Sequence, residues 1–218
     1  MKTVKDHLQS GKDVTTAIYE SGFGSSSRLY ERAQTSLGMT PATYGKGGQG
    51  IRIAYATAPC ALGRLLVAAT ARGLCAVTLR NSDQELKAAL EREYPKAEVF
   101  EDRRALNETV KEVLKYLDGD EPRLDFPLDI RATAFQCRVW KELRRIPYGT
   151  TQSYSDIARI LGRPKAARAV ARACATNPVA LVIPCHRVVA RTGDFSGYRW
   201  GLQRKEALLA REQKGRRK

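Results

Sequence analysis

The five residues Pro184-Cys185-His186-Arg187-Val188 constrain this chain most, because apolar runs at 181–183 and 188–190 flank them. Apolar neighbours on both sides predict that the Cys185 thiol lies deep between two buried segments. A thiol becomes a strong nucleophile only as the thiolate, which a nearby imidazole or positive charge favours. Adjacent side chains of an extended chain point to opposite faces, so we expect a bridging water or a local turn between Cys185 and His186. A buried structural cysteine is the alternative, and it is the usual role of a free cysteine.

The charge of the chain favours a polyanionic partner. Lys and Arg number 38 against 23 Asp and Glu, which gives a formal net charge of +15. Basic composition alone predicts only non-specific attraction, but much of the positive charge gathers in one third of the chain. The basic residues there are Arg131, Arg138, Lys141, Arg144, Arg145, Arg159, Arg163, Lys165, Arg168 and Arg172. Residues 82–129 instead mix both signs.

Cysteine spacing and hydropathy indicate the compartment. The five cysteines are Cys60, Cys75, Cys137, Cys174 and Cys185. They form no CxxC and no paired framework, so we expect free thiols in a reducing, cytoplasmic environment. No apolar stretch approaches ~20 residues, which predicts no membrane span and no membrane partner. The only histidines are His7 and His186, so we expect no Cys/His zinc site.

The pattern of residues 47–130 predicts an α/β scaffold. The expected strands lie at 51–58, 64–69, 73–79 and 125–130, and the first three suggest an antiparallel sheet. Ser82 and Glu85 have the spacing of a capping box, which opens a helix that runs to about Tyr94. A second helix with one apolar face ends at Gly119. We find no pattern that carries chemistry in this segment and expect it to be a support.

Residues 131–218 have the pattern of a helix-turn-helix. A buried helix is marked by the stripe Phe135, Val139, Trp140 and Leu143. Ser153 can cap the next helix, a turn with glycine and proline follows, and a further helix spans 165–173. Two helices joined in this way are the general pattern of a DNA-binding motif. The small residues Ala166 and Ala167 would let this backbone approach a groove floor, although they are equally compatible with tight helix packing.

Several residues accompany the Cys185 motif at particular places along the chain. Asn177-Pro178 stands ahead of it, Arg168 lies in the helix at 165–173, and Glu212 lies in the last helical stretch. This set resembles the O6-alkylguanine-DNA alkyltransferases, or methylated-DNA–protein-cysteine methyltransferases, over about residues 51 to 212. The resemblance is closest to the C-terminal half of Ada-type adaptive-response proteins, with Ser196-Gly197-Tyr198-Arg199-Trp200-Gly201 as a further shared stretch.

The resemblance implies an α+β fold in three parts. A ribonuclease-H-like α/β subdomain is expected at 47–130, and a winged-helix-like helix-turn-helix active subdomain at 131–218. Residues 1–46 form a short helical appendage in which 20–30 resemble the second helix-turn-helix of AraC-type regulators. The first such motif and the cysteine-rich zinc domain of Ada-type proteins have no counterpart in the sequence. We therefore expect neither phosphotriester repair nor full transcriptional activation.

The resemblance also implies a reaction that each molecule performs once. The partner is double-stranded DNA bearing O6-alkylguanine or O4-alkylthymine, whose lesion nucleotide is turned out of the stack. The Cys185 thiolate then attacks the alkyl carbon, and the stable thioether ends the reaction without a cofactor or metal. Glu212 orients His186, which draws the thiol proton through water. Tyr154 crowds the 3′ phosphate and donates to guanine N3, while Asn177 holds the turn before the cysteine.

The remaining implied contacts concern DNA and the guanine pocket. Arg168 is the finger that fills the space of the rotated nucleotide, on a recognition helix that enters the minor groove. Residues expected at the groove and pocket are Ala166, Ala167, Cys174, Val188, Gly197, Tyr198 and Arg199. From the residues alone, Arg168 is equally a phosphate contact, Tyr154 a core residue and Glu212 a surface glutamate. We expect the protein to act as a monomer.

Three other functions compete with this interpretation. Alkyltransferase-like proteins bind lesions without repairing them, but they lack the cysteine that is present here as Cys185. An Ada-type transcriptional regulator is favoured by residues 13–41. A Cys-His hydrolase would need an acyl intermediate and an oxyanion hole, and it leaves Arg168, Tyr154 and Asn177 without a role.

Overall fold

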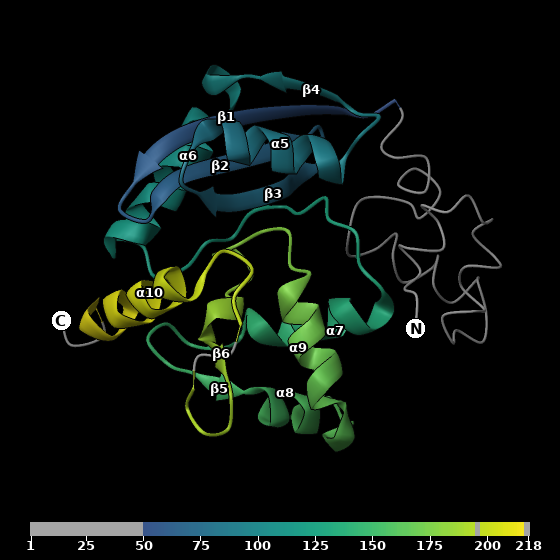
Figure 1. The fold of residues 1–218 in the computed structure, drawn as a ribbon, viewed down its shortest axis with the longest axis vertical. Coiled ribbons are helices and arrows are strands. Elements are labelled where there is room, and N and C mark those ends of the chain that lie inside the picture. The colour runs from purple at the N-terminus through teal and green to yellow at the C-terminus, as the bar shows by residue number, and fades with distance from the viewer. Residues whose placement is uncertain (1–49, 195–196, 216–218) are drawn as a thin grey trace.

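The computed structural model describes residues 50–194 and 197–215 (Figure 1). The expected helix-turn-helix at 1–46 lies outside the described residues. We call residues 50–130 the first half, and the described residues from 131 onward the second half. None of the helices in the described ranges is long and apolar enough to cross a membrane.

The first half contains a four-stranded sheet in the order β3-β2-β1-β4. Its strands are β1 (Arg52–Cys60), β2 (Gly63–Thr70), β3 (Gly73–Arg80) and β4 (Glu98–Glu101). The first three pair antiparallel, which confirms the expected strands. β4 was not predicted, and it pairs parallel with β1, so the sheet is mixed and not purely antiparallel.

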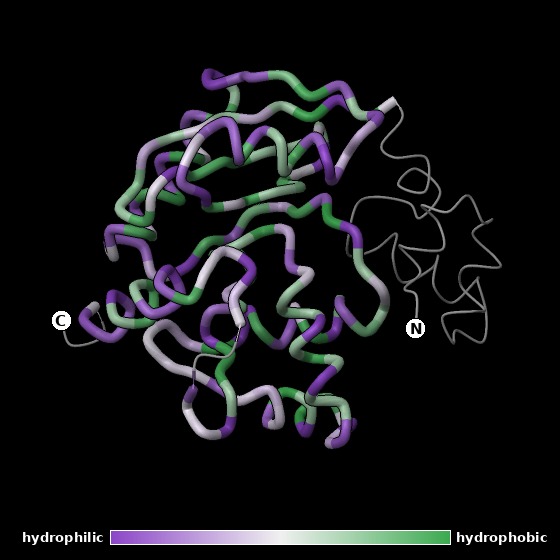
Figure 2. Tube along the Cα trace, viewed as in Figure 1, coloured by the Kyte–Doolittle hydropathy of each residue, from purple (hydrophilic) through white to green (hydrophobic). Residues whose placement is uncertain are grey.

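Helices cover both faces of this sheet. They are α5 (Asp83–Glu93) and α6 (Arg103–Asp118). Along β2, Leu66 and Ala68 join the cluster that includes α5, whereas Leu65 and Val67 join the cluster that includes α6 and the second half. This alternation is the period of two that a strand between two layers requires. In Figure 2 the central strand β2 and its neighbour β3 are largely hydrophobic in colour, while the helices alternate between hydrophobic and hydrophilic residues.

Capping residues define the helix ends as the sequence indicated. The Ser82 side chain accepts a hydrogen bond from Glu85 N, but the Glu85 carboxylate accepts from Asn81 N in place of Ser82 N. Only half of the predicted capping box is therefore formed. Gly119 ends α6 in the left-handed conformation, with φ +91°, which glycine adopts without the cost that a Cβ imposes.

The second half consists of short helices around two short parallel strands. Its elements are α7 (Ala134–Leu143), β5 (Gln152–Ser153), α8 (Tyr154–Ile160), η1 (Pro164–Ala166), α9 (Ala167–Ala175), η2 (Cys185–Arg187), β6 (Val188–Val189) and α10 (Leu202–Gly215). Ser153 caps α8 in a full capping box with Asp156. The predicted helix-turn-helix is thus present as α8, η1 and α9, which Figure 1 shows at the end of the molecule away from the sheet.

The two halves join along the outer edge of β3. Within the first half, the expected strand at 125–130 forms only a bridge to this edge, in which Leu74 N donates to Pro127 O at 2.9 Å. Further along, Val77 N donates to Pro178 O at 3.0 Å, and Ala180 N donates to Val77 O at 2.8 Å. These bonds satisfy groups that an edge strand leaves open. They also fix the segment that leads to Cys185 against the sheet.

Candidate active site

A tight turn held by Asn177 precedes the cysteine. The Asn177 amide donates to Ile183 O at 2.8 Å and to Cys185 Sγ at 3.2 Å, and its carbonyl oxygen accepts from Val179 N at 3.0 Å. Leu181 has φ +69°, a left-handed conformation that costs energy for a residue with a Cβ. The buried amide therefore closes a turn that the backbone alone would not favour, and it also contacts the sulfur.

Cys185, His186 and Arg187 form the 3₁₀ turn η2 and are all buried. The expected local turn therefore replaces the extended conformation. His186 Nε2 lies 2.8 Å from Glu212 Oε1. His186 Nδ1 is buried and has no hydrogen-bond partner among the described residues. Because an ionised carboxylate only accepts, the proton belongs on Nε2, which leaves Nδ1 as an acceptor.

The Glu212 carboxylate is the centre of a buried network. Arg187 Nε donates to Oε2 at 2.9 Å and Arg187 Nη2 to Oε1 at 3.0 Å. Tyr116 Oη donates to Oε1 at 2.6 Å, and Gly149 N donates to Oε2 at 3.1 Å. Donors therefore surround both oxygens, as a buried charge requires.

These contacts keep Glu212 charged and His186 neutral. Burial would raise the pKa of Glu212, but hydrogen bonds and charge from His186 and Arg187 outweigh it and hold the pKa at about 2. Burial lowers the pKa of His186 below 6.5, although Glu212 opposes this. A neutral imidazole with a free Nδ1 lone pair can accept a proton at neutral pH.

The Cys185 thiol is protonated at rest. Burial raises its pKa to about 11, while the Asn177 hydrogen bond and the charge of Lys205 oppose that rise. Lys205 is fully buried on α10 and donates from Nζ to Val188 O at 2.6 Å. The sulfur therefore needs removal of its proton to react, and a buried cation and an amide donor face the resulting negative charge.

Four of the expected pocket residues, Cys174, Val188, Tyr198 and Arg199, lie near this turn. Val188 N donates to Cys185 O, and Val188 O has a second lone pair beyond its bond to Lys205. Arg199 Nη1 donates to Asn177 O at 3.1 Å. The Tyr198 hydroxyl is buried and finds no partner within the described part of the chain, so it remains available as a donor. Cys174 is buried in the same hydrophobic cluster as Cys185, and Gly197 is exposed with φ +64°.

The expected DNA-contacting residues lie on the helix-turn-helix. Tyr154 begins α8, Ala166 ends η1, and Ala167 begins α9. Arg168 is exposed one residue into α9. These helices pack through Ile157, Ala158, Val170 and Ala173 into the hydrophobic cluster that contains Cys185. The buried Cys185 and the helices that carry the exposed Arg168 thus share one hydrophobic cluster.

Sequence reasoning missed two polar residues of this centre and one contact. Lys205 is seven residues before Glu212, a spacing that places both on one face of a helix and was a usable signal. Arg187 was named only as part of the motif around Cys185, and its bonds to Glu212 were not predicted. Tyr116 lies beside Val113 and Leu117 in an apolar helix face, and no local pattern links it with Glu212. Within the described ranges, no group of three or more His, Cys, Asp or Glu is arranged to hold a metal ion.

A buried thiol beside an imidazole–carboxylate pair, joined to a basic helix-turn-helix, defines a thiol-nucleophile protein with a nucleic-acid-binding element. The ribonuclease-like domain of 6-O-methylguanine DNA methyltransferase matches residues 53–130, and the DNA binding domain of that family matches residues 134–214. The inducible methylated-DNA–protein-cysteine methyltransferase of Bacillus subtilis is 38% identical over 68% of this chain and 83% of its own length. The chain therefore belongs to the methylated-DNA–protein-cysteine methyltransferase family.

Two further similarities concern length and structure. The bifunctional transcriptional activator/DNA repair enzyme Ada of Escherichia coli is 46% identical over 97% of this chain, which spans 60% of that relative. The crystal structure of Mycobacterium tuberculosis O6-methylguanine methyltransferase has a TM-score of 0.63 and 35% identity, covering 74% of this chain and 93% of its own. The structure of the Mycobacterium tuberculosis protein in complex with DNA matches with the same TM-score and identity.

Proposed function

We propose that this protein repairs DNA by transferring the alkyl group of O6-alkylguanine, and of O4-alkylthymine, to Cys185. The observation that carries this proposal is the buried Cys185 thiol, hydrogen-bonded by Asn177 and next to the His186–Glu212 pair. The names of the family relatives, which specify methylated DNA and a protein cysteine, support the substrate. The Mycobacterium tuberculosis structure solved with DNA supports DNA as the partner.

The proposed reaction begins with the loss of the thiol proton. A water carries this proton from Cys185 to His186 Nδ1, and Glu212 stabilises the imidazolium through Nε2. The thiolate attacks the alkyl carbon in line, the S–C bond forms, and the C–O6 bond breaks. The bonding electrons pass to the guanine, where a hydrogen bond from Tyr154 to N3 offsets the developing charge, and the proton held by His186 is returned through water to the released guanine. The thioether is stable, so each molecule acts once.

Access to the lesion requires that the nucleotide leave the helix. We infer that the winged-helix-like active subdomain at 131–218 binds the minor groove through α9, and that the ribonuclease-H-like subdomain at 47–130 supports it. Ala166 and Ala167 allow close approach, and Arg168 fills the vacated space. The protein acts as a monomer, and its five free cysteines support a cytoplasmic location.

A pair of cysteine variants tests the function. Cys185→Ala should bind a duplex carrying O6-methylguanine as the unchanged protein does, yet transfer no labelled methyl group to the protein. Cys60→Ala, which changes a half-buried cysteine of the first half, is the matched control and should transfer normally. Methyl transfer by Cys185→Ala would refute the proposal.

A further inference from the structure

Tyr116 connects the first half directly to the chemical centre. It lies on α6, is 3% exposed, and donates from its hydroxyl to Glu212 Oε1 at 2.6 Å. The same hydroxyl accepts from Arg187 Nη2 at 3.1 Å and lies 3.4 Å from His186 Nε2. Its proton and a lone pair are thus both engaged within the network of Glu212.

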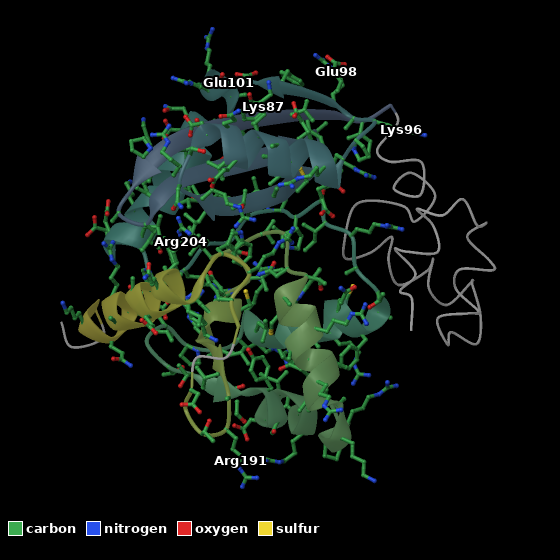
Figure 3. All side chains as sticks on the ribbon, in the orientation of Figure 1. Lys87, Lys96, Glu98, Glu101, Arg191 and Arg204 are labelled. Carbon is green, nitrogen blue, oxygen red and sulfur yellow. The ribbon has the colours of Figure 1, made fainter. Side chains whose placement is uncertain are left out.

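The helix that carries Glu212 is itself held by the first half. Arg204 donates to Leu62 O at 2.8 Å and to Asn81 Oδ1 at 2.6 Å, and Arg211 donates to Leu117 O at 2.8 Å. Figure 3 shows Arg204 where α10 meets the first half, whereas Lys87, Lys96, Glu98 and Glu101 lie on the outer side of the sheet. The first half therefore fixes both the course of α10 and one oxygen of its carboxylate.

We propose that Tyr116 is a positioning residue for proton removal from Cys185, so that the ribonuclease-like half is part of the reaction's machinery. The inference rests on the proposed alkyl transfer. Tyr116 holds Oε1 in the orientation that His186 Nε2 requires, and thereby keeps the proton on Nε2 and leaves Nδ1 free to accept the thiol proton. Without the Tyr116 hydroxyl, Arg187 Nη2 loses one of its acceptors. The Glu212 carboxylate also loses a donor to Oε1, the oxygen that His186 Nε2 contacts.

The charged groups around His186 give this role a titration signature. Those that face the imidazole are Glu212 and Lys205 from α10, Arg187 from η2, and the Tyr116 hydroxyl from α6. The hydroxyl donor draws charge from Oε1, which weakens the attraction of the carboxylate for an imidazolium. Its removal should therefore raise the pKa of His186.

The test compares Tyr116→Phe with Tyr94→Phe in the full chain. Tyr94 is also a buried tyrosine, and its hydroxyl contacts Cys75 O at 3.4 Å within the α5 face of the sheet, so its loss matches the packing change without touching Glu212. Benzyl transfer from free O6-benzylguanine is followed per active molecule at increasing concentration. The imidazole of His186 is titrated separately by nitrogen NMR, which is practical because the chain has only two histidines.

Tyr116→Phe should lower the maximum transfer rate about tenfold, leave the half-saturating concentration unchanged, and raise the pKa of His186. Tyr94→Phe should change none of these. If both variants give the same rate and the same His186 titration, Tyr116 is only a packing residue and the inference is wrong. If the unchanged protein transfers no benzyl group while Tyr116→Phe still shifts the His186 titration, the proposed function fails and the positioning contact stands.

Discussion

At the Cys185 sulfur, burial and proton affinity act together. The site is dry enough to raise the pKa of the thiol to about 11, so reactivity cannot come from a resting thiolate. In the proposed mechanism it comes from coupling the loss of the proton to His186, which burial keeps neutral.

The rate of benzyl transfer from free O6-benzylguanine should therefore be nearly independent of pH from 7 to 9, and should fall only in more acidic solution, below the ordinary pKa of an imidazole, as His186 protonates. In Glu212→Gln the relay loses its charged partner, so the rate at pH 7 should drop about 100-fold. Glu206→Gln, an exposed neighbour on α10, is the control and should react normally. A rate of the unchanged protein that rises tenfold per pH unit up to pH 9 would show direct ionisation of the thiol and contradict the relay.

The same carboxylate should make stability depend on pH. Because the pKa of Glu212 is lower in the folded protein than its ordinary 4.5, its contribution is complete above pH 4.5 and is lost as pH falls toward about 2. At pH 7, Glu212→Gln should lower the free energy of unfolding by on the order of 3 kcal/mol, because Arg187 loses its buried counter-charge. The difference in the free energy of unfolding between the unchanged protein and Glu212→Gln should become smaller by about 2 kcal/mol at pH 3, as measured by urea unfolding. A difference that is constant with pH would mean that the charge of Glu212 does not contribute.

At the scale of elements, the sequence predicted the features that depend only on neighbouring residues, such as the ends of helices. Ser153 and Gly119 were identified from sequence because a cap or a left-handed C-terminus needs only neighbouring residues. β4 was missed because its short sequence, Glu98–Glu101, has charged ends and gains its structure from pairing with β1. The segment at 125–130 was predicted as a strand, but it forms only one bridge with β3.

The exposed face of α9 carries two arginines with different expected roles. Arg168→Ala should slow repair of duplex DNA at saturating protein much more than reaction with free O6-benzylguanine, because only the duplex needs a side chain to replace the rotated nucleotide. Arg172→Ala, also exposed on α9, should weaken duplex binding and leave the saturated rate unchanged, as a phosphate contact does. Single-turnover assays on both substrates separate the two. Equal loss on both substrates for Arg168→Ala would argue against the finger.

At the scale of the whole molecule, the site depends on contacts between distant parts of the chain. Asn177 and Cys185 lie eight residues apart and were linked from sequence, with help from the family motif. Tyr116 and Glu212 are separated by 96 positions, and only the packing of α10 against the first half brings them together. The centre of the site was thus predictable, while its support from the first half was not, because no local pattern encodes that packing.

The net charge of +15 should appear in the response to salt. Raising the salt concentration from 50 to 200 mM should weaken binding to a lesion duplex by on the order of 100-fold if about four phosphates are neutralised. The maximum rate with free O6-benzylguanine should stay constant over the same range, because that substrate carries no phosphate. A duplex affinity that is insensitive to salt would exclude the basic second half as the DNA-binding surface.

The most direct measurement is peptide mass spectrometry after incubation with an oligonucleotide duplex that contains O6-methylguanine. The account predicts one methyl group on the peptide that contains Cys185, in a one-to-one ratio with restored guanine, and no further repair once the protein is consumed. An unmodified Cys185 peptide with tight lesion binding would contradict it, and would make the protein a lesion sensor whose buried cysteine is structural.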